Sequence, residues 1–180
     1  MHQRQFFMSY GAFLGLLFVL VAVLFRAFGI IDLERPVLLF TLNTMIFTGF
    51  LFFSIKQYRD IKNQGIISYS QSLKVGVTIA VFSAIIFGFW KVLLVGYIDP
   101  TYSSLHLEKQ QQSILELDNA IPGMIDNIDE TLDGLEQELA SQYKPHNIII
   151  NEIIGKAVGG FLLSLIISCF TKKQDPELII

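Results

Sequence analysis

The sequence predicts an all-α membrane protein with four transmembrane helices and an extracytoplasmic, acidic αα-hairpin between the third helix and the fourth. Three observations lead to this fold class. The chain is 52 % hydrophobic, and its long apolar runs reach the roughly 20 residues that cross a hydrocarbon core. Lys and Arg gather in short segments that flank these runs. The one long polar segment carries apolar residues at helical spacing.

The first span is expected over residues 6–25, which contain no charged residue. Arg4 precedes this run, as a basic residue precedes the apolar region of a signal peptide. The run is longer than such a region, however, and no small-x-small cleavage site follows it. The sequence therefore predicts a retained membrane helix. Gly11 and Gly15 have the GxxxG spacing, which is a weak indication of close helix packing.

The second span is expected over residues 37–55, because Pro36 suits the first position of a helix. Asn43 is the polar residue of this span that needs a partner on another helix or a water molecule. Two interpretations stay open for it. Its amide forms a hydrogen bond between helices, or it lines a polar pathway.

The third span is expected over residues 72–97, and Ser68 with Gln71 has the capping-box spacing just before it. Small residues recur every four positions along this span and so share one face, at Gly76, Ala80, Ala84 and Gly88. Helices in lipid associate through close backbone approach along such faces, so we expect this one to meet another helix. The helix should end at Asp99, because Pro100 disfavours helical backbone before it.

Lys91 interrupts the third span near its far end. A long Lys side chain at that depth can extend its ammonium to the headgroups. Two further interpretations stay open: an ion pair with Asp99 or Glu152, and contact with an ion or solute.

Residues 101–147 are predicted to form an acidic helical hairpin. They carry nine Asp or Glu against Lys109 and Lys144. Apolar residues alternate three and four apart in the second half, at Ile125, Ile128, Leu132, Leu135 and Leu139. Pro122-Gly123 separates the two helices and Pro145 ends the second. The acidic face could bind cations or a basic partner, but it lacks the spacing of a calcium loop, and a solvated face explains it equally.

The fourth span is expected over residues 148–171, followed by a cytoplasmic tail at 172–180. Glu152 lies four residues before Lys156, the favourable order for an ion pair along a helix. Gly155 and Gly159 have the GxxxG spacing, and Gly160 begins a further series of small residues at intervals of four. We therefore expect spans three and four to pack together.

The basic residues set the predicted orientation. They lie in the head, in the connection between spans two and three, and in the tail, at Arg4, Lys56, Arg59, Lys62, Lys74, Lys172 and Lys173. The positive-inside rule places these segments in the cytoplasm. Both termini are then cytoplasmic, and residues 1–100 contain the first three spans.

The sequence contains no recognisable catalytic constellation. Cys169 is the single cysteine, so the chain can form no internal disulfide, and the three His are far apart in head and loop segments. No zinc-protease, hydrolase, nucleotide-binding or nucleic-acid-binding pattern occurs. We therefore expect no enzyme activity, no cofactor, no metal site and no nucleic-acid partner.

A stretch around the third span resembles a known family. The residues that carry the likeness are Tyr58-Arg59-Asp60, Gly65, Ser68, Gln71-Ser72-Leu73-Lys74-Val75-Gly76 and Tyr97-Ile98-Asp99-Pro100. They resemble a domain family of unknown function, made of small four-span membrane proteins typical of Bacteroidota. The predicted hairpin is longer and more acidic than is usual there. The resemblance implies four helices and a bacterial inner (cytoplasmic) membrane location, and it brings no activity, ligand or catalytic residue.

Two functions follow as hypotheses. The small-residue faces and the hairpin favour an accessory or interaction protein that self-associates or docks to a membrane complex. Its partners would be the lipid bilayer and either further copies or another membrane protein. The alternative is a subunit of a small oligomeric transporter or channel that uses Asn43 and Lys91.

Overall fold

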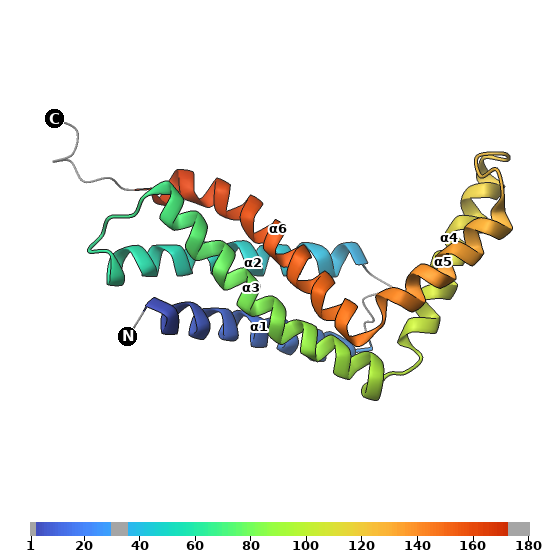
Figure 1. Cartoon of the computed structure of the whole chain (residues 1–180), viewed down its shortest axis with the longest axis horizontal. Coiled ribbons are helices and arrows are strands. Elements are labelled where there is room, and N and C mark those ends of the chain that lie inside the picture. The colour runs from blue at the N-terminus through green and yellow to red at the C-terminus, as the bar shows by residue number, and fades with distance from the viewer. Residues whose placement is uncertain (1–2, 30–35, 173–180) are drawn as a thin grey trace. The chain divides into compact units, whose positions relative to one another are not determined.

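The computed structural model describes residues 3–29 and 36–172, and the elements within them are helices (Figure 1). They are α1 (Gln3–Ala27), α2 (Pro36–Gln57), α3 (Tyr69–Leu93), α4 (Tyr102–Ala120), α5 (Ile128–Gln142) and α6 (Pro145–Thr171). One π-helical turn extends α2 over Tyr58–Lys62, and another extends α3 over Leu94–Ile98. The all-α prediction is confirmed for this part of the chain. The predicted tail beyond Lys172 lies outside the described residues.

Four of these helices are long and apolar enough to cross a membrane: Gln3–Ala27, Pro36–Lys62, Tyr69–Ile98 and Pro145–Thr171. The shortest has 25 residues, which corresponds to about 37 Å at the α-helical rise and exceeds a hydrocarbon core of roughly 30 Å. The prediction of four membrane-spanning helices is therefore confirmed by length and composition. The sequence-predicted spans lie inside these helices. The last helix begins at Pro145, because proline is well accommodated in the first turn.

The chain divides into two compact units, which are described separately. Among the described residues, the bundle unit contains 3–29, 36–88 and 152–172, and the paired-helix unit contains 89–151. The bundle unit therefore holds α1, α2, most of α3 and most of α6. The paired-helix unit holds α4 and α5 with the adjoining ends of α3 and α6.

In the bundle unit, α1 packs against α3 through its two spaced glycines. A Cβ added at Gly15 would lie 2.9 Å from the Ser83 carbonyl oxygen and 2.8 Å from the Ile86 Cβ. A Cβ at Gly11 would collide with Phe82. The two backbones thus approach too closely for any side chain at these positions. The GxxxG spacing, weak as a sequence signal, marks a close helix contact here.

The small-residue face of α3 packs against α6. Gly76, Ala80, Ala84 and Gly88 are all buried. A Cβ at Gly160 would lie 2.5 Å from the Cβ of Ala80, and a Cβ at Gly76 would collide with the side chain of Ser164. The predicted pairing of the third and fourth spans is therefore present, and the small-residue face is used within the protomer.

The residues of α6 that make this contact differ from the predicted pair. A Cβ at Gly155 would meet nothing within 4 Å, and a Cβ at Gly159 would meet Phe47 at 3.7 Å. Each residue turns the helix by about 100°, so Gly160 and Ser164 share a row that Gly159 does not join. Two series of small residues therefore run along α6, one through Gly155 and Gly159 and one through Gly160 and Ser164. The second series packs against α3.

The opposite end of the bundle, where α1 begins and α2 ends, is held by aromatic side chains. Phe6 and Phe7 are buried and each lies 5.5 Å from the ring of Tyr58, centroid to centroid. The hydroxyl of Tyr58 accepts a hydrogen bond of 2.8 Å from the Gln3 amide. In the same region Arg59 donates to the carbonyl oxygen of Thr171, which satisfies one of the last free carbonyls of α6.

The start of α3 confirms the capping box. The backbone N–H of Gln71 donates to the Ser68 hydroxyl at 3.2 Å, and the Ser68 N–H donates to the Gln71 side-chain oxygen at 3.1 Å. These reciprocal bonds satisfy donors that a helix N-terminus otherwise leaves free. The far end also follows the sequence, because the helical backbone of α3 and its π-helical turn stops at Asp99, before Pro100.

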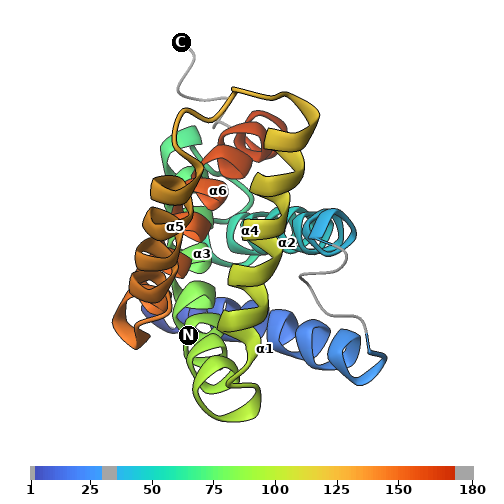
Figure 2. The ribbon, with the colours of Figure 1, turned by 90° about the vertical axis from the view of Figure 1, so that its right-hand side faces the viewer.

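In the paired-helix unit, α4 and α5 run side by side and are joined at one end by the turn around Pro122-Gly123 (Figure 2). The predicted apolar stripe of α5 is half-buried or buried along its length, and Leu139 is the most enclosed. Near the other end, the hydroxyl of Tyr143 lies 2.6 Å from the His106 Nδ1, and the Tyr143 ring packs edge-to-face on Tyr102. Tertiary contacts thus join the first turns of α4 to the last residues before α6.

Candidate functional site

The membrane bundle contains an ion pair on α6. The ammonium of Lys156 contacts the carboxylate of Glu152, as the spacing predicted. The side chains are only 15 % and 14 % exposed, so the pair is largely enclosed by the protein. Lys156 lies about 16 Å along the helix from Pro145, because α6 begins earlier than the sequence indicated. Ionisable residues inside membrane helices are costly and are functional-site candidates for that reason.

Two aromatic rings from other helices hold the Lys156 ammonium. Its Nζ lies 4.1 Å from the ring centroid of Phe87 on α3 and 5.3 Å from that of Phe18 on α1. Both distances are within the range of a cation–π interaction, which gains strength where water is excluded. Three helices therefore converge on this charge. Sequence reasoning missed the two rings, since nothing in an apolar span distinguishes a Phe that faces a cation from one that faces lipid.

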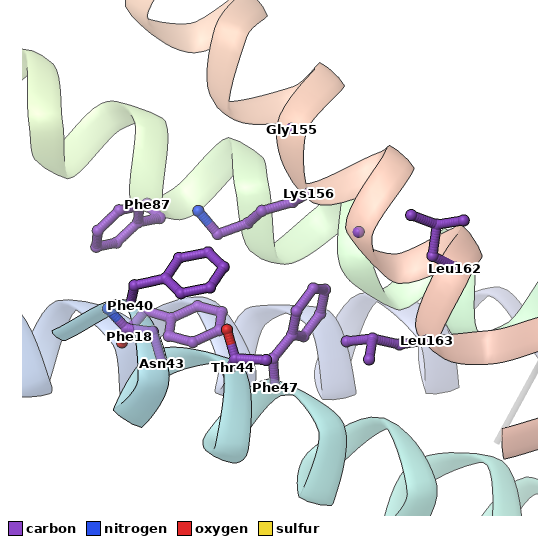
Figure 3. Close-up of a pocket in the computed structure, with 11 residues that line it drawn as sticks. Phe18, Phe40, Asn43, Thr44, Phe47, Phe87, Gly155, Lys156, Leu162 and Leu163 are labelled. Carbon is purple, nitrogen blue, oxygen red and sulfur yellow. The ribbon is translucent and has the colours of Figure 1, made fainter. Parts of the chain in front are cut away.

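A cavity of about 390 Å³ adjoins the ion pair within the bundle unit (Figure 3). We call it the bundle cavity. Its lining comes from α1, α2, α3 and α6: Phe18, Phe40, Asn43, Thr44, Phe47, Phe87, Gly155, Lys156, Gly159, Leu162 and Leu163. Polar side chains in this set are confined to Asn43, Thr44 and Lys156. The cavity is therefore an apolar space with a few polar groups, the composition typical of small-molecule sites.

Gly155 and Gly159 explain why this space is open. Both line the cavity on α6, and a side chain at Gly155 would extend into unoccupied volume. The sequence predicted these glycines as helix-packing residues. An added Cβ would meet nothing within 4 Å at Gly155 and only the Phe47 ring at Gly159, so their main effect is to leave room beside Lys156.

Asn43 faces the cavity from α2 (Figure 3). The Thr residues beside it behave as expected in a membrane helix, since the hydroxyls of Thr41 and Thr48 donate back to carbonyl oxygens one turn earlier. The amide of Asn43, in contrast, makes no hydrogen bond with any part of the chain that the structure describes, although it is half-buried. Within the described residues Asn43 therefore forms no interhelical hydrogen bond, and it lines this largely apolar cavity.

Lys91 and Asp99 belong to the paired-helix unit and do not line the bundle cavity. Lys91 is half-buried on the last turn of α3. The carboxylate of Asp99 accepts a hydrogen bond of 2.6 Å from the Thr101 hydroxyl, where the chain leaves α3. Neither residue belongs to the lining that Asn43 and Lys156 share.

The paired-helix unit has its own polar surface. Of the nine carboxylates in residues 101–144, eight are exposed and Asp118 is half-buried. A second cavity, of about 520 Å³, lies between α4 and α5 and is lined by residues that include Ser104, Glu136, Tyr143 and Lys144. Within residues 3–29 and 36–172, no group of three His, Cys, Asp or Glu side chains is placed to hold a metal ion.

Four apolar helices, a nearly all-helical chain and a charged pair enclosed among them define a multi-pass helical membrane protein. The model of one protein family, described as "Protein of unknown function (DUF4199)", matches residues 9–173. The chain belongs to this family, as the resemblance around the third span predicted. No curated protein and no solved structure matches the chain.

Proposed function

We propose that this protein is an accessory membrane protein that docks to a partner through α5. The observation that carries the proposal is the charge of α5. This helix has five carboxylates, no basic residue, and its apolar stripe turned toward α4. The charged side chains that α5 exposes are therefore all acidic. We propose a partner with a basic surface.

The acidic face of α5 has an energetic cost in the isolated protein. Asp129 and Asp133 are four residues apart, and Glu136 follows three residues later. Like charges at these spacings destabilise a helix by about 0.2–0.5 kcal/mol per pair. A basic partner relieves this repulsion and gains long-range attraction during encounter. Self-association along the α3 stripe is not part of the proposal, because α6 already covers that stripe.

A photo-crosslinker at Gln137, which is exposed on α5, tests docking in the native membrane. We expect a crosslinked species whose yield falls as salt rises from 0.1 M to 1 M, since the Debye length shrinks from about 10 Å to 3 Å. Replacing Glu136 and Glu138 by Gln should abolish the species. Replacing Glu108 and Glu116 on α4 by Gln removes the same charge and should preserve it. Equal loss in both variants, or no loss in either, contradicts docking through α5.

The proposal includes an orientation: both termini in the cytoplasm of a bacterial cell, the chain in the inner membrane, and α4 with α5 outside. The supporting pattern is the set of basic residues around the connection from α2 to α3, including Lys56, Arg59 and Lys62. Cysteine accessibility tests it in a Cys169→Ser background, because the native Cys169 is exposed.

Two exposed positions serve as reporters of orientation. A Gly134→Cys variant on α5 should react with a membrane-impermeant maleimide in intact cells, and Ser70→Cys at the start of α3 should react only after lysis. At Gly134 an added Cβ meets nothing within 4 Å, so the substitution is sterically free. The reverse labelling pattern would overturn the orientation and with it the extracytoplasmic partner.

A second candidate function is a subunit of an oligomeric transporter or channel. It is favoured by Asn43 and Lys156, polar groups from α2 and α6 that line one cavity inside the bundle. Solute or ion flux in proteoliposomes should then fall in an Asn43→Leu variant. Flux equal to that of empty liposomes would remove this candidate. Neither candidate involves a chemical reaction, a cofactor or a nucleic acid.

A further inference from the structure

We propose that the bundle cavity is a binding site for a neutral, membrane-soluble amphiphile: an apolar chain or ring system that carries a carbonyl oxygen. Asn43 donates to that oxygen, and the phenylalanines hold the apolar part. This site is independent of docking through α5, because the cavity lies wholly in the bundle unit.

The size and lining of the cavity point to an apolar occupant. Its volume of about 390 Å³ lies in the range of ligand pockets, roughly 300–1,000 Å³. Four phenylalanines surround it, contributed by three helices: Phe18, Phe40, Phe47 and Phe87. Such rings offer large contact areas and no hydrogen-bonding groups, so they favour hydrocarbon or a flat ring over a hydrated solute.

The rim of the cavity indicates entry from the bilayer. Phe40 on α2 is 73 % exposed and Leu162 on α6 is 54 % exposed, and both line the cavity. On helices of this length and composition, exposed apolar side chains face lipid. Gly155 and Gly159 add no side chain of their own to the α6 wall of the cavity. A molecule dissolved in the membrane can therefore reach Asn43 without crossing water.

The Asn43 amide calls for a hydrogen-bonding ligand. An amide in an apolar environment is costly unless it is hydrogen-bonded, and the described part of the chain gives this one no partner. Asn offers two N–H donors and one acceptor. A carbonyl oxygen satisfies the donors at the smallest desolvation cost to the ligand, since it has no proton of its own to satisfy.

The charges beside the cavity favour a neutral ligand. The Lys156 ammonium is already compensated by the Glu152 carboxylate and by the rings of Phe18 and Phe87. The Lys156 ammonium and the Glu152 carboxylate are in contact, so their attraction and repulsion of a charged headgroup largely cancel. No net attraction then offsets the cost of taking that headgroup's charge out of water. A neutral acceptor avoids this cost. Fatty-acid esters and quinones both combine a neutral carbonyl oxygen with an apolar body. The test therefore includes one probe of each kind.

Binding can be measured on the full chain in mild detergent by native mass spectrometry. The probes are methyl oleate, oleyl methyl ether, oleate and a short-chain menaquinone. The ether has the same chain as the ester and no carbonyl, and oleate has the carbonyl with a charge. We expect the ester, the menaquinone or both to bind, with the ether and oleate weaker. Whichever carbonyl probe binds more tightly identifies the source.

Three variants locate the site. Asn43→Leu should weaken binding of the carbonyl probe about five-fold, as expected for one hydrogen bond, and should weaken ether binding less, because an ether oxygen is the poorer acceptor. Gly155→Leu places a side chain in the cavity and should abolish binding of every probe. Gly49→Leu is the matched control, because an added Cβ there also meets nothing within 4 Å and Gly49 does not line the cavity.

Several outcomes would overturn the inference. Unchanged affinity for methyl oleate in Asn43→Leu would show that the amide takes no part. Tighter binding of oleate than of methyl oleate would show that the cavity selects for negative charge. Equal binding in Gly155→Leu and Gly49→Leu would place the ligand elsewhere, and no binding by any probe would reject the site. Circular dichroism of each variant confirms that loss of binding is not loss of helix.

Discussion

The contact between α3 and α6 can be tested by exchanging one methyl group across it. A Cβ at Gly160 would lie 2.5 Å from the Cβ of Ala80, which is fully buried. Two carbon atoms pack favourably at about 3.5–4.0 Å, so Gly160→Ala must push the helices apart by about 1 Å or more. We expect a loss of about 1–3 kcal/mol in the free energy of unfolding, the usual cost of overpacking.

The compensating change is Ala80→Gly, which removes the atom that the new methyl group meets. Glycine in a helix is less stable than alanine by about 0.5–1 kcal/mol, so Ala80→Gly lowers the helix stability and Gly160→Ala raises it by a similar amount. The free energy of unfolding of the double variant should therefore be close to that of wild type. The other neighbours of the new Cβ are the Phe47 ring at 3.5 Å and the Gly76 carbonyl at 3.8 Å, which are ordinary contacts. The double variant therefore tests the contact between positions 80 and 160 alone.

Unfolding of the four proteins in mixed micelles, titrated with a denaturing detergent, gives the coupling energy of a double-mutant cycle. We expect a coupling of at least about 1 kcal/mol in favour of the double variant. Gly49→Ala is a matched control, since its added methyl group meets nothing, and it should stabilise slightly. A neutral Gly160→Ala, or a coupling energy of zero, would refute the close approach of α3 and α6.

Three further predictions concern other contacts. Lys156→Met should destabilise the bundle by about 3 kcal/mol, because it removes the counter-ion of the enclosed Glu152 carboxylate. The double variant Lys156→Met with Glu152→Gln should recover part of this loss. The same unfolding titration measures the single and the double variant, and an equal loss in the two would argue against the ion pair. Ser68→Ala should cost about 1 kcal/mol through the capping box, whereas exposed Ser70→Ala should cost little, and equal effects would contradict the cap. Tyr143→Phe removes the hydroxyl that contacts His106 and should speed hydrogen exchange in α4 and α5, and unchanged exchange would show that this bond contributes nothing to the pair.

The features that sequence reasoning predicted correctly are local ones. The capping box of Ser68 and Gln71 joins residues three apart, and the ion pair of Glu152 and Lys156 joins residues four apart. Helical geometry fixes such distances once a helix forms. The end of α3 before Pro100 depends only on the geometry of proline. Each of these follows from a few neighbouring residues and required no knowledge of the fold.

The candidate site depended on contacts between helices, and sequence reasoning located it only in part. Asn43 and Lys156 were both recognised as polar residues inside spans, but nothing in the sequence indicated that they line one cavity. The sequence hypothesis combined Asn43 with Lys91, which does not line this cavity. Distances between residues on separate helices depend on the rotation of each helix about its axis, which an apolar run does not reveal.

The sequence by itself determined that the chain forms four long apolar helices, because a bilayer allows a hydrophobic run of this length to satisfy its backbone only as a helix. It also determined which helices contain close-packing glycines. Only the tertiary structure decided how those glycines are used: Gly160 admits α3, and Gly155 leaves a cavity beside Lys156. The physical reason is that lipid tails are as apolar as the helices. Burial therefore does not orient a membrane helix, and the close fit of neighbouring backbones does.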